Sequence, residues 1–284
     1  MFNKKIYLIL IIVLPGFYLY SEENKTLPMD KMTKSVVYIE GEKNKIEKLN
    51  NIDYEIGIRL LGDKEFQPLT ERVTGTGFFV RNEEFLFLVT AQHVAKNLMS
   101  NVKLITADSS GNSTSYFLDK NTLWTYSENA DIAITNIVNP LLKKTFYDTA
   151  LDFNLLPSSE TSPVPELSLV VVGFPLGLGV QKKFSPLRRE SNAASGLIDL
   201  KRSDIDKTST FFLLQDPSIG GYSGAPVFVL KTYKFGNTLM NSIDVDLCIG
   251  IIHGTYSDNT GGKLGLVTPT DKLYELIYSY SNKH

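Results

Sequence analysis

The stretch Gly220-Gly221-Tyr222-Ser223-Gly224-Ala225-Pro226-Val227-Phe228 contains the strongest structural signal in this chain. It places a serine between small residues, on a predicted turn that leads into an apolar strand. Glycines let the backbone turn sharply and let N–H groups point at one spot beside the serine oxygen. A serine hydroxyl is a poor nucleophile unless a base removes its proton. The stretch therefore predicts a nucleophile, Ser223, provided that the chain also supplies a base.

Two upstream segments supply a candidate base and a candidate acid. The apolar run Phe85–Val89 leads into Thr90-Ala91-Gln92-His93, so that His93 ends a predicted strand and begins a short helical turn. An imidazole titrates near neutral pH and can accept the serine proton and later return it. Asp131 directly precedes the apolar run Ile132–Ile134, and a carboxylate there could hold the other ring nitrogen. The alternative carboxylates Asp119, Asp148 and Asp152 do not directly precede an apolar strand.

Four pieces of the chain carry a family resemblance: TGTGFFV (74–80), LVTAQHV (88–94), DIAI (131–134) and GYSGAPVF (221–228). They resemble the trypsin-like serine proteases of the chymotrypsin fold, most of all the bacterial branch with the HtrA-type proteases and the glutamyl endopeptidases. The order His, Asp, Ser is that of this family and differs from the orders in subtilisins and α/β-hydrolases. The resemblance covers roughly residues 52–278. It implies an all-β fold of two six-stranded antiparallel β-barrels, a cleft between them and a C-terminal helix.

The resemblance also implies a role for each candidate residue. Ser223 would be the nucleophile, His93 the general base, and Asp131 the carboxylate that orients His93. The backbone N–H groups of Gly221 and Ser223 would form the oxyanion hole. Gln92 stands where many members of the family carry Ala or Ser.

Tyr222 bears on activation. In the digestive members of the family, the residue before the serine is an Asp that pairs with a new N-terminus after activation cleavage. A tyrosine cannot form that ion pair, so we expect no zymogen activation of this kind.

Substrate preference is less strongly encoded. Six residues before Ser223, where trypsins carry the Asp that binds Arg or Lys, this chain has Pro217, and Asp216 lies one position away. Cleavage after Arg or Lys is therefore not expected. The loop 215–221 resembles that of the glutamyl endopeptidases, which makes Ser218 a candidate substrate-binding residue. Those enzymes also carry a histidine on the strand after the serine, which makes His253 a second candidate.

His253 comes one residue later than the pocket histidine of those enzymes, and a one-residue shift in a strand changes its face. Three interpretations of His253 therefore stay open. It could line the primary pocket, favouring acidic or Gln side chains, it could be a strand residue near Asp131, or it could have a purely structural role.

Composition excludes several functional classes. The chain has 284 residues, 43% of them hydrophobic, and a formal net charge of −2, which suits a globular protein and argues against nucleic acid as a partner. The single cysteine, Cys248, lies in an apolar run and cannot form an intramolecular disulfide. Three scattered histidines and one cysteine do not make a standard zinc site, so we expect no metal and no cofactor.

The N-terminus resembles a targeting segment. Lys4 and Lys5 precede an apolar run from Ile6 to Tyr20, which Pro15-Gly16 interrupts and which is shorter than the ~20 residues that span a bilayer. Residues 1–21 are therefore predicted to be a signal peptide, or an N-terminal anchor if they are not cleaved. We expect an exported protein, periplasmic or secreted, that meets a membrane only if this segment is retained.

The rest of the chain divides by composition and by short strand-like runs. We expect a polar lead-in at 22–51, a first barrel with His93 and Asp131 at 52–140, a connection at 141–165, and a second barrel with Ser223 at 166–284. Apolar residues at helical spacing predict a helix over 270–280 with Thr270 as its cap. Because the chain ends soon after this helix, we expect no PDZ domain and, by default, a monomer.

The sequence thus predicts an exported serine endopeptidase that acts on protein or peptide substrates through an acyl-enzyme. One alternative is a catalytically weak binding or adhesion module on the same fold. A second is an α/β-hydrolase esterase, which would need glycine at position 225 and parallel β-α units; the chain has Ala225 and many short strands instead.

Overall fold

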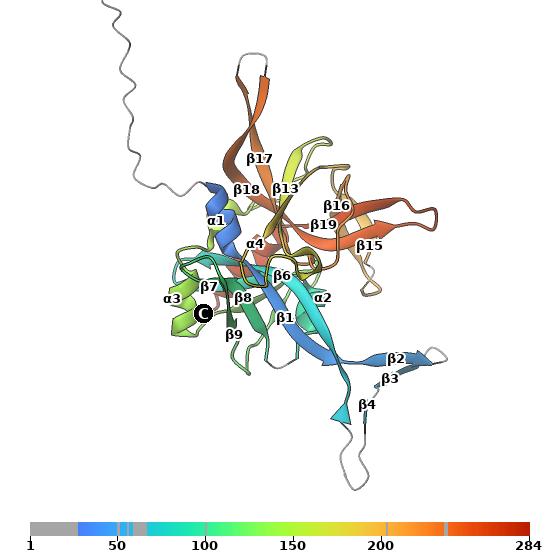
Figure 1. The fold of residues 1–284 in the computed structure, drawn as a ribbon. Coiled ribbons are helices and arrows are strands. Elements are labelled where there is room, and N and C mark those ends of the chain that lie inside the picture. Colours follow the sequence, from blue (N-terminus) through green and yellow to red (C-terminus); the bar gives the residue numbers. More distant parts are fainter. Residues whose placement is uncertain are drawn as a thin grey trace, which may run out of the picture.

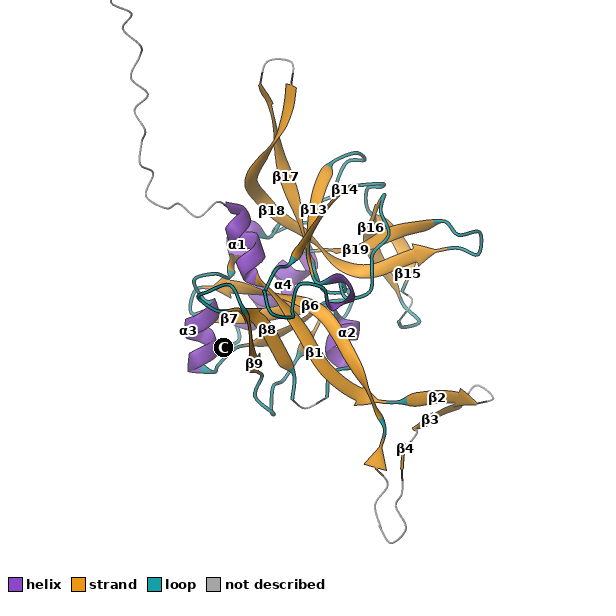
Figure 2. Cartoon of the chain, in the orientation of Figure 1, coloured by secondary structure: helices purple, strands orange, loops and turns teal. Residues whose placement is uncertain are grey.

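A computed structural model describes residues 28–49, 52–55, 57–58, 67–99, 101–202, 204–235 and 238–284 of the chain (Figure 1). The predicted signal segment 1–21 lies outside these ranges. Among the helices within them, none combines the length and apolarity needed to cross a bilayer. The described chain is mostly β-structure, as expected, with most of its strands in two antiparallel sheets (Figure 2).

The first sheet has the strand order β10-β11-β7-β6-β1-β8-β9, with β12 added beside β6. His93 follows β7 in the chain, and Asp131 precedes β11. Its strands are β1 (Val36–Asn44), β6 (Thr70–Asn82), β7 (Phe85–Thr90), β8 (Lys103–Ala107), β9 (Ser113–Phe117), β10 (Thr125–Tyr126), β11 (Ala133–Asn136) and β12 (Leu151–Asp152). Eight strands are therefore assigned over the described residues instead of six. The two additional ones are the two-residue strands β10 and β12, of which β12 pairs with β6 in parallel.

This sheet begins earlier in the chain than expected. Strand β1 lies inside the range 22–51 that composition assigned to a polar lead-in, and it pairs with both β6 and β8. Its first residues, Val36–Ile39, are buried, whereas the Lys- and Glu-rich part that follows is mostly half-buried, with Glu42 exposed. The range was assigned to a lead-in despite its short apolar piece Val36–Ile39, because Lys, Glu and Asn dominate its composition.

The second sheet contains the turn with Ser223 and has the order β14-β13-β17-β18-β19-β16-β15. Its strands are β13 (Ser168–Gly173), β14 (Leu187–Asn192), β15 (Ile198–Lys201), β16 (Thr208–Leu214), β17 (Pro226–Phe235), β18 (Thr238–Ser257) and β19 (Lys263–Pro269). Strands β17 and β18 form a long hairpin that projects from the body (Figure 2). Two short pairs, β2 (Ile46–Leu49) with β3 (Ile52–Glu55) and β4 (Gly57–Ile58) with β5 (Gln67–Pro68), lie between β1 and β6 in the chain.

The helices are short. They are α1 (Pro28–Ser35), α2 (Gln92–Lys96), α3 (Pro140–Phe146) and α4 (Asp271–Ser281), with 3-10 turns η1 (Phe153–Leu155) and η2 (Pro175–Gly177). Two of the helices, α1 and α4, contribute buried side chains to the apolar core. Helix α4 confirms the expected C-terminal helix. Thr270 precedes it, but the Thr270 hydroxyl donates to the Cys248 carbonyl oxygen at 2.6 Å and does not cap the helix. Burial raises the pKa of the Cys248 thiol to about 12, as expected for a small core residue.

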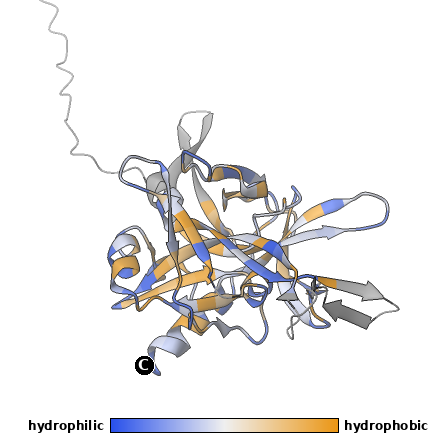
Figure 3. Cartoon of the chain, turned by 60° about the horizontal axis from the view of Figure 1, so that its bottom comes forward, coloured by the Kyte–Doolittle hydropathy of each residue, from blue (hydrophilic) through white to orange (hydrophobic). Residues whose placement is uncertain are grey.

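One apolar cluster joins the two sheets. It contains Phe78 and Phe87 from the first sheet, Val170 and Phe228 from the second, and Ile277 from α4, all buried. Separate clusters fill the remaining interior of each sheet, and the hydrophobic segments gather in the body of the molecule (Figure 3). Because this shared cluster packs the sheets against each other, side chains from both sheets can meet at one site.

Candidate active site

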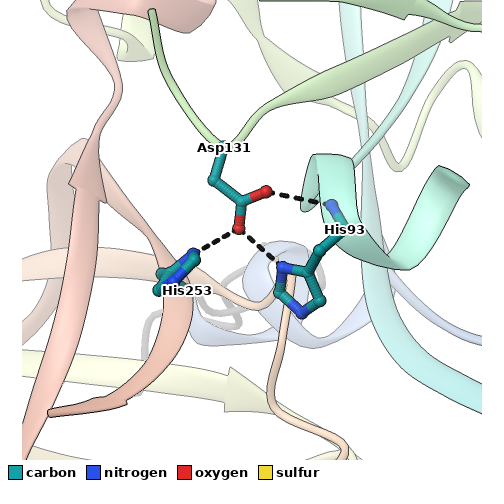
Figure 4. Close-up of side chains that lie close together, drawn as sticks. All are labelled: His93, Asp131 and His253. Atoms are coloured by element: carbon teal, nitrogen blue, oxygen red, sulfur yellow. Dashed lines mark hydrogen bonds and ion pairs between the residues drawn. The ribbon is translucent and has the colours of Figure 1, made fainter. Parts of the chain in front are cut away.

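Strand pairing brings His93 and Asp131 together. Strands β7 and β11 are antiparallel with Ala133 opposite Thr90, so the residues just beyond their paired ends are neighbours. The His93 backbone N–H donates to Asp131 Oδ1 at 2.9 Å, and His93 Nδ1 lies 2.7 Å from Asp131 Oδ2 (Figure 4). The Asp131 side chain is fully buried, whereas that of His93 is 25% exposed. The imidazole is therefore held on one side by a buried carboxylate and faces solvent on the other.

His253 contacts the same carboxylate. Its Nδ1 lies 2.5 Å from Asp131 Oδ2, and its ring meets that of His93 edge to face with centroids 5.3 Å apart (Figure 4). The His253 side chain is 3% exposed. Of the interpretations that the sequence left open, the structure agrees with the one that places His253 near Asp131. The strand register between β18 and β19 shifts between Ile252 and Gly254, and such a bulge re-aims side chains.

Arg202 is a third partner of Asp131, and no sequence motif marks it. It follows β15 in the second sheet, and its side chain is 1% exposed. Nη2 donates to Asp131 Oδ1 at 3.0 Å and to Gln92 Oε1 at 3.0 Å. The same guanidinium pairs with Asp204 through Nε, at 2.9 Å, and through Nη2, at 2.6 Å. The unusual glutamine before His93 thus has a partner in the other sheet.

These contacts keep Asp131 ionised. Burial by itself raises the pKa of Asp131, but the hydrogen bonds from His253 and His93 outweigh it and hold that pKa well below its usual range. The pKa of Asp204 is also lowered: burial opposes the shift, and the hydrogen bond from Arg202 favours it. The site therefore holds two carboxylates around one buried guanidinium.

His93, His253 and Asp131 also have side chains of the kind that bind metal ions. In the described part of the chain they form the one such group of three, with ring nitrogens and a carboxylate oxygen within 4.8 Å of one another. The sequence suggested that the three histidines are scattered, but the structure brings two of them, His93 and His253, together. Both Nδ1 atoms, however, lie at hydrogen-bond distance from one carboxylate oxygen, and a buried guanidinium contacts the other oxygen. A cation here would face the charge of Arg202, so the group is best described as a hydrogen-bonded cluster.

Ser223 lies on a turn whose shape requires glycine. Gly221 has φ +98° and Gly224 has φ +86°, a region that favours glycine. A Cβ on Gly221 would lie 2.4 Å from the Phe174 carbonyl oxygen, and one on Gly224 would lie 2.2 Å from the Thr76 carbonyl oxygen. The turn therefore packs directly against backbone on both sides.

Thr76 fixes this turn from the first sheet. Its backbone N–H donates to the Ser223 carbonyl oxygen at 2.9 Å, and its hydroxyl donates to the Gly221 carbonyl oxygen at 2.7 Å. The Thr76 hydroxyl also accepts from the Phe174 N–H at 3.1 Å. This explains the TGTG piece of β6, because its threonine side chain ties the serine turn to the sheet that contains His93.

The turn also leaves two N–H groups available. The Gly220 carbonyl oxygen accepts from the Leu176 N–H at 2.6 Å, and in a trans peptide the N–H of Gly221 points the opposite way. Within the described chain, neither the Gly221 N–H nor the Ser223 N–H donates to an acceptor. Both residues line a cavity of about 680 Å³, together with His93 and Leu176.

In the described structure, Ser223 and His93 share this cavity, but their side chains form no hydrogen bond with each other. Ser223 Oγ donates to the His253 carbonyl oxygen at 3.3 Å, and the His93 side chain is hydrogen-bonded to Asp131. Hydrogen bonds of catalytic groups are often long in unliganded proteins and shorten when substrate binds. The structure thus joins His93 to Asp131 and places Ser223 at the same cavity.

The other predicted substrate-binding residue, Ser218, lies at a second, much smaller cavity of about 10 Å³. This cavity is lined by Val171, Arg189, Ser191, Leu214, Asp216, Pro217, Ser218, Tyr222 and Ile252. Arg189 pairs with Asp216 at 3.2 Å and donates to the Pro217 carbonyl oxygen at 2.7 Å. Ile252 reaches this cavity and His253 does not, so a preference for acidic or Gln side chains has no support from His253.

Comparison with known proteins agrees with this geometry. The family model described as "Trypsin-like peptidase domain" matches residues 75–232, which is more than half of the chain. The match includes His93, Asp131 and Ser223 and ends before His253. A search of curated proteins found no match. With its two antiparallel sheets, its C-terminal helix and this match, the chain belongs to the trypsin-like peptidase domain family and has the chymotrypsin-like fold.

Proposed function

We propose that this protein is an exported serine endopeptidase in which Ser223 is the nucleophile, His93 the general base and Asp131 the carboxylate that orients His93. One observation supports this most strongly. The imidazole of His93 is held by a buried carboxylate, and it lines the same cavity as Ser223 and two N–H groups that have no acceptor among the described residues.

The proposed reaction begins with proton transfer. Because Nδ1 of His93 faces Asp131, Nε2 is the nitrogen available to the cavity and accepts the proton of Ser223 Oγ. The oxygen attacks the carbonyl carbon of the peptide bond and forms a tetrahedral oxyanion. The N–H groups of Gly221 and Ser223 donate to this oxyanion, an interaction for which each donor typically contributes on the order of a hundredfold or more in rate.

The tetrahedral species then collapses. His93 gives its proton to the leaving amine nitrogen, the C–N bond breaks, and Ser223 retains the acyl group as an ester. A water molecule enters, His93 takes one of its protons, and the resulting hydroxide attacks the ester carbon. The carboxylic acid product leaves, and the proton returns to Ser223 Oγ. Asp131 stabilises the imidazolium in both half-reactions.

A peptide-cleavage assay tests this proposal. The purified protein is incubated with a peptide library of mixed sequence, beside Ser223→Ala and the matched control Ser159→Ala, an exposed serine outside both cavities. We expect cleavage by the wild type and by Ser159→Ala, and none by Ser223→Ala. Equal cleavage by Ser223→Ala would refute the role of Ser223. A folded wild type that cleaves nothing would favour the binding or adhesion module instead.

A further inference from the structure

Arg202 is a buried charge placed where the two sheets meet. It belongs to the segment after β15 of the second sheet, yet two of its partners, Gln92 and Asp131, belong to the first. A buried ion is costly unless it is paired and fully hydrogen-bonded. Here a guanidinium with 1% exposure contacts two carboxylates and one amide oxygen. Such a set of contacts fixes the position of every member.

The two carboxylate oxygens of Asp131 have different sets of hydrogen-bond partners. Oδ1 accepts from Arg202 Nη2 and from the His93 backbone N–H, which prevents the carboxylate from rotating. Oδ2 is left for the two imidazole nitrogens, at 2.7 Å from His93 and 2.5 Å from His253. The orientation of His93 therefore depends on what holds Oδ1.

We propose that Arg202 is a positioning residue for the peptidase reaction, which fixes Asp131 and limits how strongly that carboxylate stabilises the proton on His93. The inference rests on the proposed function, because it assigns Arg202 to the same reaction. Arg202 does not face the cavity that contains Ser223, so it acts through Asp131.

The charges around the site give the direction of the effect. Asp131 faces His93 from α2, His253 from β18 and Arg202 from the loop after β15, with Asp204 behind Arg202. The other charged or titratable groups at the cavity are Tyr38, Lys43, Glu71 and Arg72. Removing the charge of Arg202 leaves two carboxylates without their shared cation, which stabilises a protonated His93. Removing the charge of Asp204 leaves Arg202 less compensated, which does the opposite.

Two substitutions that remove charges of opposite sign, Arg202→Met and Asp204→Asn, therefore test the inference. The rate of labelling by a fluorophosphonate probe is measured from pH 5 to pH 9, and the ring titration of His93 is followed by NMR in the same variants. The chain has only three histidines, so the ring signals can be assigned with single substitutions. We expect Arg202→Met to move the midpoint of both profiles upward by about one pH unit or more, and Asp204→Asn to move both downward. A one-unit upward shift lowers the labelling rate below the midpoint about tenfold.

Matched controls separate positioning from folding. Lys201→Met removes a neighbouring charge whose Nζ pairs with Asp206 at 2.5 Å on the exposed side of the same hairpin, and should leave both midpoints unchanged. Arg202→Lys keeps the charge and should restore the midpoint at least in part. If Arg202→Met does not fold, Asp204→Asn still tests the sign of the effect, because it should move both midpoints downward. In an Asp131→Asn background, Arg202→Met should have little further effect on the labelling rate, because both act on one carboxylate.

Failure of the inference differs from failure of the proposed function. Unchanged midpoints in folded Arg202→Met and Asp204→Asn, or shifts in the same direction, would overturn the role of Arg202 while wild-type labelling stands. Absence of labelling in the wild type would overturn the peptidase proposal. The NMR titration would then still decide whether Arg202 controls the proton on His93.

Discussion

At the scale of single residues, Asp131 connects the site. Its buried carboxylate accepts hydrogen bonds from the His93 backbone, two imidazoles and one guanidinium. Trypsin-like peptidases need a carboxylate at this point to select the imidazole tautomer and to stabilise the imidazolium. The additional partners here add a structural role, because they join residues of both sheets through one side chain.

We predict that Asp131→Asn lowers the rate of fluorophosphonate labelling by about 10³- to 10⁴-fold at pH 7. An amide would present an N–H to one of its partners and would leave Arg202 without one of its anions. Stopped labelling reactions measure the rate, and circular dichroism confirms that the variant is folded. A loss of less than tenfold in a folded variant would contradict the role of Asp131.

The low pKa of Asp131 predicts acid sensitivity. Because its pKa is lower in the folded than in the unfolded state, the ionised carboxylate stabilises the fold above the unfolded value of about 3.9. That stability is lost as pH falls from there toward the folded value, and Asp204 acts in the same direction. Urea unfolding of wild type and Asp131→Asn between pH 3 and pH 7 measures this. We expect the difference in unfolding free energy between them to shrink below pH 4; a constant difference would argue against the ionised pair.

At the scale of elements, the serine turn is held by backbone packing. Gly220 and Gly221 are adjacent, yet only Gly221 combines a positive φ with a close approach to the Phe174 carbonyl oxygen. Nothing lies within 4 Å of a Cβ placed on Gly220. The two glycines therefore form a matched pair for testing the turn.

We predict that Gly221→Ala lowers the labelling rate at least a hundredfold, because the strained turn displaces an N–H of the proposed oxyanion hole. Its melting temperature should also fall by several degrees. In Gly220→Ala, the labelling rate should stay within about twofold of the wild-type rate, and the melting temperature within about two degrees of the wild-type value. Similar losses in both variants would indicate that the turn does not depend on the conformation of Gly221.

The sequence predicted the elements better than their contacts. The strand ends with His93 and Asp131 were predictable, because their partnership follows from the pairing of two strands near each other in the chain. Arg202 was missed, because its burial depends on packing between sheets and on Gln92 and Asp131, which precede it by many residues. The face of His253 was left open, because a bulge decides it. Strand β1 was assigned to a lead-in, because its polar half dominates the local composition.

At the scale of the whole molecule, Tyr222 is relevant to activation. It is 3% exposed and packs in the apolar cluster of the second sheet, beside Leu169, Val171 and Ala225. Burial raises the pKa of the Tyr222 hydroxyl, so that it stays neutral and offers no anion to a new N-terminus.

We therefore predict that the mature protein, starting after the proposed signal segment 1–21, is active without further processing. N-terminal sequencing of the exported protein should give a start near Glu22, and labelling should occur without further processing. Activity that appears only after cleavage at residues 50–55 would contradict this, since it would require a newly formed N-terminus.

The central claim is that His93 and Asp131 activate Ser223. The most direct measurement is mass spectrometry of the wild-type protein, Ser223→Ala and His93→Ala after exposure to a fluorophosphonate probe, with His284→Ala as the control histidine. We predict one probe per wild-type molecule, located by peptide mapping on Ser223, an equal result for His284→Ala, and no modification of the other two variants. Modification of another serine, or unchanged modification of His93→Ala, would contradict the claim.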